Sequence, residues 1–304
     1  MSLVQVEGRE LKLSNLDKVL YPATGFTKGQ VIDYYTRVAP VLLPHLRRRA
    51  LTLKRYPNGV DGKFFYEKNC PSHRPPWVET LTVLSPRGRH EQVSYCLIDE
   101  LASVVWVANL AALELHTSLA HAEDVGRPTT LVFDLDPGAP ATVVECCQVA
   151  LLVRALLDEL GLATFAKTSG SKGLQVYAPL NTEVGYDRTK PFAHSLARLL
   201  EARHPELVVS SMSKDVRKGK IFIDWSQNDP VKTTVCVYSL RARERPTVST
   251  PLTWDEVEAG AAADDPESLV FDASSALDRV EQHGDLFAPV AELEQALPDA
   301  VPET

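Results

Sequence analysis

The chain has 304 residues, of which 44% are hydrophobic and 24% are charged, and its formal net charge is −8. Such a chain can bury one large core or two modest ones, since single domains reach roughly 250 residues. No run approaches the roughly 18 to 20 apolar residues of a membrane span, and the first residues lack the basic start and apolar core of a signal peptide. We therefore expect a globular, cytoplasmic protein without a membrane partner.

The charge is unevenly distributed along the chain. From Trp254 to Thr304 there are fourteen Asp or Glu and one Arg, a net charge of −13, so the first 253 residues carry a net charge of +5. Basic residues cluster where loops are expected, at 47–49 with 54–55, at 214–220 and at 241–245. Because phosphate binding needs surplus Lys and Arg, this distribution is compatible with a nucleic-acid partner despite the negative total.

The five cysteines are odd in number and form no C-x-x-C pair. Two of them are adjacent inside a helical pattern, where bridging is awkward. We therefore expect all five to be reduced thiols of the core, without a zinc or redox role. They are Cys70, Cys96, Cys146, Cys147 and Cys236.

The first half of the chain predicts a long helix followed by extended segments. Thr27 is expected to cap a helix over about 28–48, because apolar residues recur there at helical spacing. Alternating or aromatic-rich sequence predicts strands at 51–56, 63–68 and 92–98. Asp99 is expected to cap an apolar helix that runs through Leu110, and a short strand is predicted at 113–116.

The second half begins with an apolar strand at 129–136, stopped by Pro137 and Gly138, and continues with a helix at about 141–160. Further strands are predicted at 164–167, 174–178, 220–225 and 233–237, with a helix at about 191–203. We expect a surface connection at 259–267 and a frayed tail after Pro298. Because strands and helices do not alternate strictly, the pattern favours an α+β fold with mixed or antiparallel sheets.

Asp134 and Asp136 close the apolar strand at 129–136. They are two residues apart, so their side chains project to the same face of the strand. Two like charges so close repel each other unless a cation lies between them. Oxygen ligands without a nearby His or Cys select Mg²⁺ or Mn²⁺ over zinc. The alternative interpretation is an Asp-rich turn that only closes the strand.

Two further motifs carry candidate chemistry. Asp224 closes another apolar strand and would complete a site for two metal ions if the two strands are neighbours; otherwise it is a turn residue. The turn at 168–173 has glycines that allow backbone amides to face an anion, and Lys172 supplies charge. It is not a Walker loop, because a strand follows it where such a loop opens a helix. A plain hairpin turn is the alternative.

In combination, these motifs resemble a known family. They occur in the order and spacing of the polymerase domain of bacterial DNA ligase D, which belongs to the archaeo-eukaryotic primase superfamily. The resemblance implies an α+β fold with a primase-like catalytic core, whose mixed or antiparallel sheets are flanked by helices. It covers about residues 8–290. The motifs are Asp134-Leu-Asp136, Ser169-Gly-Ser-Lys-Gly-Leu-Gln175, Ile223-Asp224-Trp-Ser-Gln-Asn and Tyr238-Ser-Leu-Arg241, with Leu113-Glu-Leu-His116, Lys54-Arg-Tyr-Pro-Asn-Gly-Val-Asp61 and Asn15-Leu-Asp-Lys-Val-Leu-Tyr-Pro22 upstream.

The resemblance also implies roles for individual residues. The metal-binding and catalytic carboxylates are Asp134, Asp136 and Asp224. The residues implied to bind the incoming nucleotide are His116, Ser169, Lys172, Gln175, Gln227 and Arg241. Other residues are implied to bind DNA. Lys18 and Lys28 would grip a 5′ phosphate beyond a gap, and Phe65 and Tyr66 would stack on the template. Arg217 would position the primer terminus, and the basic pair Lys54 and Arg55 would also contact DNA.

One position departs from the family pattern. The motif that begins at Ser169 usually ends with His, and this chain has Gln175 there. A neutral amide can hydrogen-bond a phosphate oxygen but cannot supply positive charge or a proton. The departure bears on triphosphate binding and catalytic rate, and not on the metal carboxylates.

The function implied by the resemblance is a DNA-dependent nucleotidyltransferase, a primase-polymerase that uses two Mg²⁺ or Mn²⁺ ions. It would fill short gaps or extend ends in DNA repair and non-homologous end joining, with a preference for ribonucleotides. The expected partners are nucleoside triphosphates, gapped or broken DNA with a 5′ phosphate, a separate DNA ligase and Ku, and the expected location is the nucleoid region of the cytoplasm.

Two other functions remain open from the sequence. A phosphohydrolase of haloacid-dehalogenase type also begins with an apolar strand ending in D-x-D, with the first Asp as nucleophile. A DNA-end-binding repair module with weak catalysis is the other alternative. For the polymerase we expect a single, free-standing domain over 1–304. Its parts would be an N-terminal subregion at about 1–110 with the 5′-phosphate grip, a catalytic core at 111–250 and an acidic helical segment at 251–304.

Overall fold

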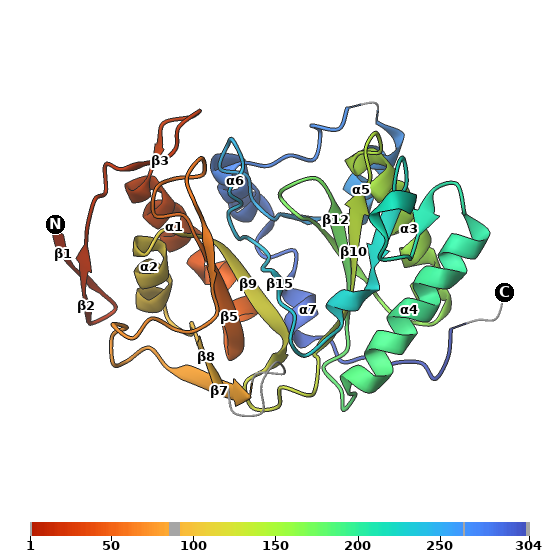
Figure 1. Ribbon diagram of the computed structural model, residues 1–304, viewed down its shortest axis with the longest axis horizontal. Coiled ribbons are helices and arrows are strands. Elements are labelled where there is room, and N and C mark those ends of the chain that lie inside the picture. Colours follow the sequence, from red (N-terminus) through yellow and green to blue (C-terminus); the bar gives the residue numbers. More distant parts are fainter. Residues whose placement is uncertain (1, 85–91, 264, 302–304) are drawn as a thin grey trace. The chain divides into compact units, whose positions relative to one another are not determined.

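The computed structural model describes residues 2–84, 92–263 and 265–301. It is an α+β structure in which the chain forms two compact units, each assembled from three separate segments (Figure 1). Unit 1 consists of Met1–Glu123, Thr233–Ser249 and Phe271–Asp285, and unit 2 of Asp124–Lys232, Thr250–Val270 and Leu286–Thr304. Among the described helices, none combines the length and apolar character needed to span a membrane.

Unit 1 is built around a largely antiparallel sheet with helices packed beside it. The strand order is β15, β9, β5, β8, β7, and β6 pairs with β5. These strands are β5 (Arg49–Arg55), β6 (Phe65–Glu67), β7 (Thr80–Leu84), β8 (Gln92–Cys96), β9 (Ala112–His121) and β15 (Thr234–Val235). Two hairpins precede them, β1 (Ser2–Val6) with β2 (Arg9–Leu13) and β3 (Val19–Tyr21) with β4 (Phe26–Thr27). The helices are α1 (Lys28–Leu46), α2 (Leu101–Asn109) and α6 (Ala273–His283).

The two predicted helix starts in unit 1 have different outcomes. Thr27 caps α1 as expected, in a capping box with Gln30. The cap of α2 is Glu100 and not Asp99, so that prediction is wrong by one residue. The carboxylate of Asp99 instead accepts a hydrogen bond from the backbone N–H of Arg48 at 2.8 Å, which ties the start of α2 to the end of α1.

Buried tyrosines of the N-terminal region hold the distant segment Thr233–Ser249 in unit 1. The Tyr34 hydroxyl donates to the backbone oxygen of Tyr238 at 2.8 Å, and the Tyr21 hydroxyl donates to that of Arg241 at 3.0 Å. Each bond satisfies a buried carbonyl that would otherwise be costly to desolvate. Arg241 is therefore positioned by residues more than 200 positions away in the sequence.

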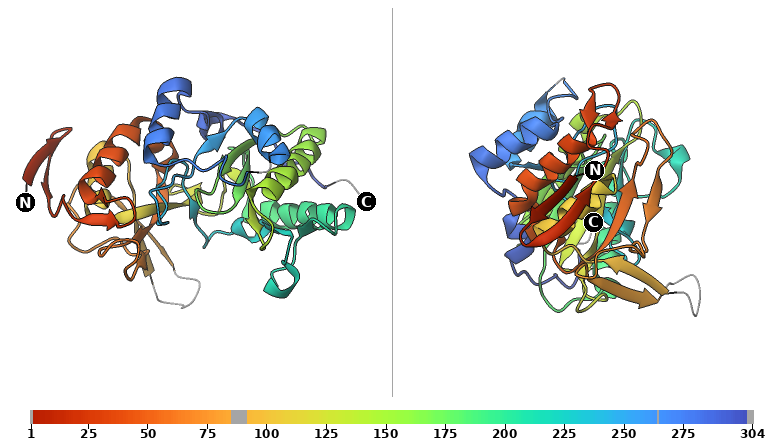
Figure 2. Two further views of the ribbon diagram at one scale, coloured as in Figure 1. Left: turned by 90° about the horizontal axis from the view of Figure 1, so that it is seen from above. Right: turned by 90° about the vertical axis from the view of Figure 1, so that its left-hand side faces the viewer.

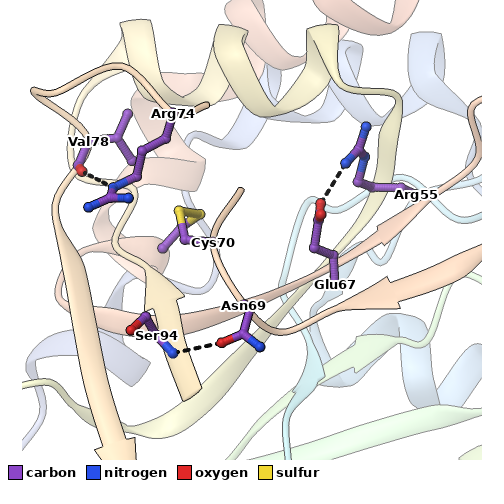
Figure 3. Close-up of a disulfide and its surroundings, with 8 residues drawn as sticks. Arg55, Glu67, Asn69, Cys70, Arg74, Val78 and Ser94 are labelled. Carbon is purple, nitrogen blue, oxygen red and sulfur yellow. Dashed lines mark hydrogen bonds and ion pairs between the residues drawn. A yellow bond between two sulfur atoms is a disulfide. The ribbon is translucent and has the colours of Figure 1, made fainter. Parts of the chain in front are cut away.

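A disulfide joins Cys70, which follows β6, to Cys96 at the end of β8 (Figure 3). After β6 the chain runs along β8, where the N–H of Cys70 donates to the backbone oxygen of Ser94 at 2.6 Å and the Ser94 N–H donates to Asn69 Oδ1 at 3.0 Å. The two Cα atoms are 4.9 Å apart, within bridging range. The prediction of five reduced thiols is thus wrong for this pair, because spacing in the sequence does not reveal that the two segments are neighbours. Cys146, Cys147 and Cys236 are buried reduced thiols, as expected.

We expect Cys70→Ser to lower the free energy of unfolding by about 3 to 4 kcal/mol under oxidising conditions, because the bridge closes a loop of 26 residues in the unfolded chain. Urea unfolding with and without dithiothreitol measures this effect. Reductant should destabilise the natural chain and leave Cys70→Ser unchanged; an equal response of both proteins would show that the bridge does not form in solution.

Unit 2 is built around a six-stranded sheet in the order β13, β14, β10, β12, β11, β16. Only the β13–β14 pairing is parallel. The strands are β10 (Thr130–Pro137), β11 (Phe165–Thr168), β12 (Leu174–Pro179), β13 (Val208–Val209), β14 (Ile221–Asp224) and β16 (Pro251–Leu252). The helices are α3 (Val143–Glu159), α4 (Tyr186–Arg203), α5 (Trp254–Ala262) and α7 (Ala288–Glu292), with short 3₁₀ turns η1 (Lys214–Val216) and η2 (Trp225–Gln227). The left view of Figure 2 shows the long helices α3 and α4 of this unit in green and blue-green.

Two boundaries in unit 2 differ from the prediction. Helix α4 begins at Tyr186, after the cap Gly185, and accommodates Pro191 inside it, whereas the prediction started the helix at that proline. Helix α5 extends to Ala262, so the surface connection expected at 259–267 is partly helical. Residue 264 of that connection and residues 302–304 of the expected frayed tail lie outside the described residues.

Candidate active site

The three predicted metal carboxylates lie on one face of the unit 2 sheet. Strand β10 is central and pairs antiparallel with β12 on one side and β14 on the other. Asp134 is directly opposite Asp224, and Asp136 follows two residues later on the same strand. Because opposite residues of an antiparallel pair share a face, as do residues two apart, all three carboxylates project together. The two strands are therefore neighbours, as the predicted site requires.

At Asp134, burial and the neighbouring carboxylates outweigh the nearby positive charge. Burial, followed by the negative charge of Asp136, raises the pKa of Asp134 to about 7, and Asp224 adds to the rise. A hydrogen bond from Gln175 Nε2 to Asp134 Oδ1, at 2.9 Å, acts in the opposite direction. A divalent cation among these oxygens would remove the repulsion, so the donor set fits Mg²⁺ or Mn²⁺.

Asp224 is held by its own turn. Its Oδ1 accepts from the N–H of Ser226 at 3.0 Å and from the Ser226 hydroxyl, and its Oδ2 accepts from Gln227 Nε2 at 2.9 Å. Lys232 donates to the same Ser226 hydroxyl. Within residues 2–84, 92–263 and 265–301, no three His, Cys, Asp or Glu side chains are already grouped to hold an ion. Asp224 is thus oriented by three hydrogen bonds from its own turn.

Asn228 anchors this turn and was not among the predicted site residues, although the family motif that begins at Ile223 ends with it. Its fully buried side chain accepts from the N–H of Val132 at 2.9 Å and donates to the Val132 oxygen at 2.8 Å and to the Trp225 oxygen at 2.9 Å. These bonds attach the turn after β14 directly to β10. Asn228 thus fixes the end of the strand that carries Asp224.

The turn at 169–173 is closed by its own hydrogen bonds. Ser169 Oγ accepts from the N–H groups of Ser171 at 3.2 Å and Gly173 at 3.1 Å. A Cβ on Gly173 would lie 2.1 Å from the Leu135 carbonyl oxygen, so only glycine allows the turn to pass this close to β10. The backbone N–H groups of Ser171 and Gly173, two of those expected to face an anion, therefore donate hydrogen bonds within the turn. The exposed side chain of Lys172 carries positive charge.

Arg217 lies beside the carboxylates. Its guanidinium is 3.6 Å from the ring centroid of Phe222, and Phe222 is the cross-strand partner of Asp136. A Cβ on Gly138 would lie 1.8 Å from the Arg217 oxygen, so the loop is packed tightly against the end of β10. The structure therefore places this predicted primer-positioning residue next to the face of unit 2 that carries the three carboxylates.

Unit 1 contains a second polar cluster, centred on Glu114. This carboxylate is only 2% exposed and contacts three of the predicted site residues. Lys54 Nζ lies 3.2 Å from its Oε1, and His116 Nε2 and Arg241 Nε lie 2.9 Å and 3.3 Å from its Oε2. The backbone N–H of Ala242 also donates to it at 3.2 Å. The sequence did not single out Glu114, although its position in the Leu-Glu-Leu-His motif was a usable signal.

These contacts fix the protonation states in the cluster. Burial by itself would raise the pKa of Glu114, but the hydrogen bond from His116 and the charges of Arg241 and Lys54 hold it well below its usual value. Burial lowers the pKa of His116, and the positive charge of Arg241 lowers it further against the opposing effect of Glu114. At neutral pH the carboxylate is therefore ionised and the imidazole is neutral.

Three consecutive aromatic side chains are exposed next to this cluster. Phe64, Phe65 and Tyr66 are 49%, 44% and 56% exposed. Lys54 Nζ lies 4.5 Å from the ring centroid of Phe64 and 5.5 Å from that of Tyr66, and the Arg55 guanidinium is 5.1 Å from the Phe65 ring. Exposed aromatics with cations beside them are suited to stacking on nucleic-acid bases. Phe64 is an addition to the predicted pair.

Lys18 and Lys28 are held close together by the β3–β4 hairpin. The Lys28 N–H donates to the Lys18 oxygen at 2.8 Å, and the largely buried Lys28 Nζ donates to the Ser14 oxygen at 2.7 Å. Burial lowers the pKa of Lys28, and so do the positive charges of Lys18 and Arg55. Three cations in one region are suited to a phosphate group.

The basic clusters are only partly in loops. Arg48 follows α1 and pairs with Glu79 at 2.9 Å and Glu123 at 2.6 Å, while Arg49 begins β5 and donates to the Leu119 oxygen at 2.9 Å. Lys54 and Arg55 are also in β5, where Arg55 pairs with Glu67 at 2.6 Å (Figure 3). The expectation of loops is therefore wrong for Arg49, Lys54 and Arg55, which lie in β5, whereas Arg48 lies in the turn before that strand.

Comparison with known proteins identifies the family. Residues 27–287 match the family model described as LigD, primase-polymerase domain. The chain belongs to this family. The resemblance found in the sequence motifs is thereby confirmed, and the primase-polymerase domain is a nucleotidyltransferase. The phosphohydrolase interpretation of Asp134 is wrong.

Relatives of known function are similar over nearly the whole chain. The multifunctional non-homologous end joining protein LigD of Mycolicibacterium smegmatis is 43% identical over 92% of this chain, and the bifunctional LigD of Bacillus subtilis is 32% identical over 90%. The chain spans only 36% and 43% of the length of these two relatives.

The fold also matches a solved structure. The polymerase domain from Mycobacterium tuberculosis ligase D, in complex with DNA, is similar with a TM-score of 0.85 and 41% sequence identity. The match covers 94% of this chain and 99% of that one. The predicted α+β primase-like fold is confirmed.

Proposed function

We propose that this LigD primase-polymerase domain fills short gaps or extends ends in broken DNA by template-directed nucleotide addition, with a preference for ribonucleotides. The observation that carries the proposal is the grouping of Asp134, Asp136 and Asp224 on one sheet face, where their mutual repulsion calls for a divalent cation. The similar domain of Mycobacterium tuberculosis was solved in complex with DNA, which supports a DNA substrate.

Asp134, Asp136 and Asp224 would hold the metal ions. Two Mg²⁺ or Mn²⁺ ions would supply Lewis acidity to the attacking and leaving oxygens of the transfer. The chain itself contributes carboxylates that are held in register by β10 and β14 and an Asp224 side chain that is oriented by Ser226 and Gln227.

We assign nucleotide binding to His116 and Arg241 of unit 1 and, in unit 2, to Ser169, Lys172 and Gln227. Glu114 supports this assignment, because one carboxylate contacts both His116 and Arg241 and thereby orients them. A neutral His116 can donate or accept a hydrogen bond to a phosphate or sugar oxygen without repelling Arg241. Gln175 is treated separately below.

We assign DNA binding to the exposed aromatics and the lysine pair of unit 1, and to Arg217 of unit 2. Phe65 and Tyr66, with Phe64 beside them, present ring faces for an unpaired template base. Lys18 and Lys28 present concentrated charge for a 5′ phosphate. The expected partners in end joining are Ku and a DNA ligase, as the names of the relatives suggest.

Primer extension on gapped duplexes tests the function. With Mn²⁺, the protein should add one to a few nucleotides at a short gap, faster with ribonucleotides than with deoxyribonucleotides. Gap lengths, the two sugars and the presence of a 5′ phosphate should be varied independently. Absence of extension under every combination would reject the polymerase proposal.

Replacing both lysines should remove the dependence on the 5′ phosphate. With Lys18→Ala and Lys28→Ala combined, we expect binding to a 5′-phosphorylated gap to weaken about tenfold to a hundredfold, since each charged contact contributes roughly 1 kcal/mol or more. Binding to the gap without phosphate should change little. Fluorescence anisotropy measures both affinities; equal losses on the two substrates would contradict the assignment.

A DNA-end-binding module with weak catalysis is the second candidate function. It is favoured by Gln175, which replaces a residue that can carry charge. Under this alternative the protein binds phosphorylated gaps tightly but incorporates no nucleotide. The extension assay above distinguishes the two.

A further inference from the structure

Four residues that lie opposite one another on neighbouring strands form a row from a buried lysine to two carboxylates of unit 2. Lys167 of β11 lies opposite Gln175 of β12. Gln175 in turn lies opposite Asp134 of β10, and Asp134 lies opposite Asp224 of β14. Directly opposite residues share a face, with Cβ atoms about 5 Å apart. Gln175 therefore lies between a lysine and the candidate metal ligands.

The amide of Gln175 is directed at Asp134. Its Nε2 donates to Asp134 Oδ1 at 2.9 Å, and its Oε1 accepts from the Tyr177 hydroxyl at 3.4 Å. A reversed amide would place Oε1 against the carboxylate, so the two contacts together select one orientation. The side chain is only 2% exposed. It is thus engaged with a carboxylate and is largely withdrawn from the surface that a nucleotide would reach.

Lys167 explains why a neutral amide is sufficient at this position. Its side chain has no exposed surface, and its Nζ lies 5.5 Å from the Tyr177 ring centroid. A buried ammonium needs negative charge nearby, and the cross-strand row places Lys167 two strands away from the Asp134 carboxylate. Lys167 supplies, from inside the sheet, positive charge that Gln175 does not carry.

We propose that Gln175 is a positioning residue, which fixes one oxygen of the Asp134 carboxylate for metal binding and does not contact the triphosphate. This inference rests on the proposed function, since it takes Asp134 as a metal ligand. Gln175 retains a hydrogen-bond donor at the place where the family pattern usually has His. Its replacement of His therefore preserves the metal site and removes a titratable group.

Mn²⁺ binding to the DNA-free protein tests the inference without reference to activity. Gln175→Leu keeps the side-chain bulk and removes the donor. It should weaken Mn²⁺ binding by about tenfold to a hundredfold, the usual effect of losing a group that orients a metal ligand. Electron paramagnetic resonance of the free ion measures this affinity. At saturating Mn²⁺ its KM for nucleoside triphosphate should equal that of the natural chain. Gln175→His keeps a donor and should restore Mn²⁺ binding.

Tyr177→Phe provides a milder variant that leaves the sheet packing in place. It keeps the ring, which packs edge-on against Phe287 with centroids 5.1 Å apart, and removes the hydroxyl that orients the amide. Mn²⁺ binding should weaken about twofold to tenfold, as expected for loss of one hydrogen bond. If thermal unfolding shows that Gln175→Leu is not folded, this variant decides the question.

The outcomes separate this inference from the proposed function. Asp134→Asn should abolish tight Mn²⁺ binding; if it does not, the metal site itself is wrong. If Asp134→Asn abolishes binding but Gln175→Leu and Tyr177→Phe leave it unchanged, only the positioning role is overturned. A raised KM for nucleotide in Gln175→Leu at saturating Mn²⁺, with unchanged Mn²⁺ binding, would show that Gln175 contacts the nucleotide directly.

Discussion

Asp134→Asn should reduce Mn²⁺-dependent primer extension by two to three orders of magnitude or more, the loss that follows removal of a group stabilising charge in a transition state. The variant keeps the shape of the side chain and its place opposite Asp224. It also relieves the repulsion that raises the pKa of Asp134, so the folded protein should be at least as stable as the natural chain. Single-turnover extension on a gapped duplex measures the rate.

Asp158→Asn is a matched control for this experiment. Asp158 lies on the exposed side of α3 in the same unit and pairs with Arg154 at 3.5 Å. Its loss should leave extension unchanged. Gapped-DNA affinity should be the same for both variants, because Asp134 is assigned to the metal and not to DNA. Extension by Asp134→Asn within tenfold of the natural rate would contradict the proposed metal site.

Glu114→Gln should lower the free energy of unfolding by about 3 to 5 kcal/mol, the usual effect of removing one member of a buried ion pair. Glu114 is the shared anion of Lys54, His116 and Arg241, and each of these side chains is at most 17% exposed. The amide would leave the two basic residues partly buried without their counter-charge. Denaturant unfolding measures the change.

Glu79→Gln is the corresponding surface control. Glu79 pairs with Arg48 at 2.9 Å but is 70% exposed. Exposed pairs of this kind contribute about 0 to 1 kcal/mol, so the control should be nearly neutral. Similar effects of the two substitutions would show that the Glu114 cluster is much more hydrated than the structure indicates.

The same carboxylate predicts a pH dependence of stability. The pKa of Glu114 in the folded chain lies well below the ordinary value of 4.5, since its three partners outweigh the effect of burial. Its contribution is therefore complete above the unfolded pKa and decreases as the pH falls through the acid range. Between about pH 5 and pH 3 the natural chain should lose stability more steeply than Glu114→Gln. Parallel curves would contradict the depressed pKa.

Local sequence patterns were sufficient for much of the site. The apolar strand that ends in Asp134 and Asp136 was predictable because side chains alternate along a strand, whatever its neighbours are. The helix capped by Thr27 was equally local, since the capping box lies within four residues. The family motifs added Asp224 in the correct order along the chain, but not its distance from the other two carboxylates.

Local patterns failed in two situations. In the first, two adjacent residues could each cap the same helix, and in the second, the interacting residues are far apart in the sequence. Asp99 was a reasonable helix cap, yet it bonds to the end of α1 and Glu100 takes the cap. Cys70 and Cys96 are 26 residues apart, and only the path of the chain along β8 brings them together.

The sequence by itself determined which chemical groups this protein carries: two carboxylates on one strand, a third on another, and basic and hydroxyl side chains in the order of the family, to which we assign phosphate binding. The tertiary structure decided how these groups act on one another. Strand register places Asp134 between Asp224 and Gln175, and the pairing of β5 with β9 places Glu114 opposite Lys54. The physical reason is that alternation along a strand is encoded locally, whereas register depends on which strands pair and on the packing of the whole sheet.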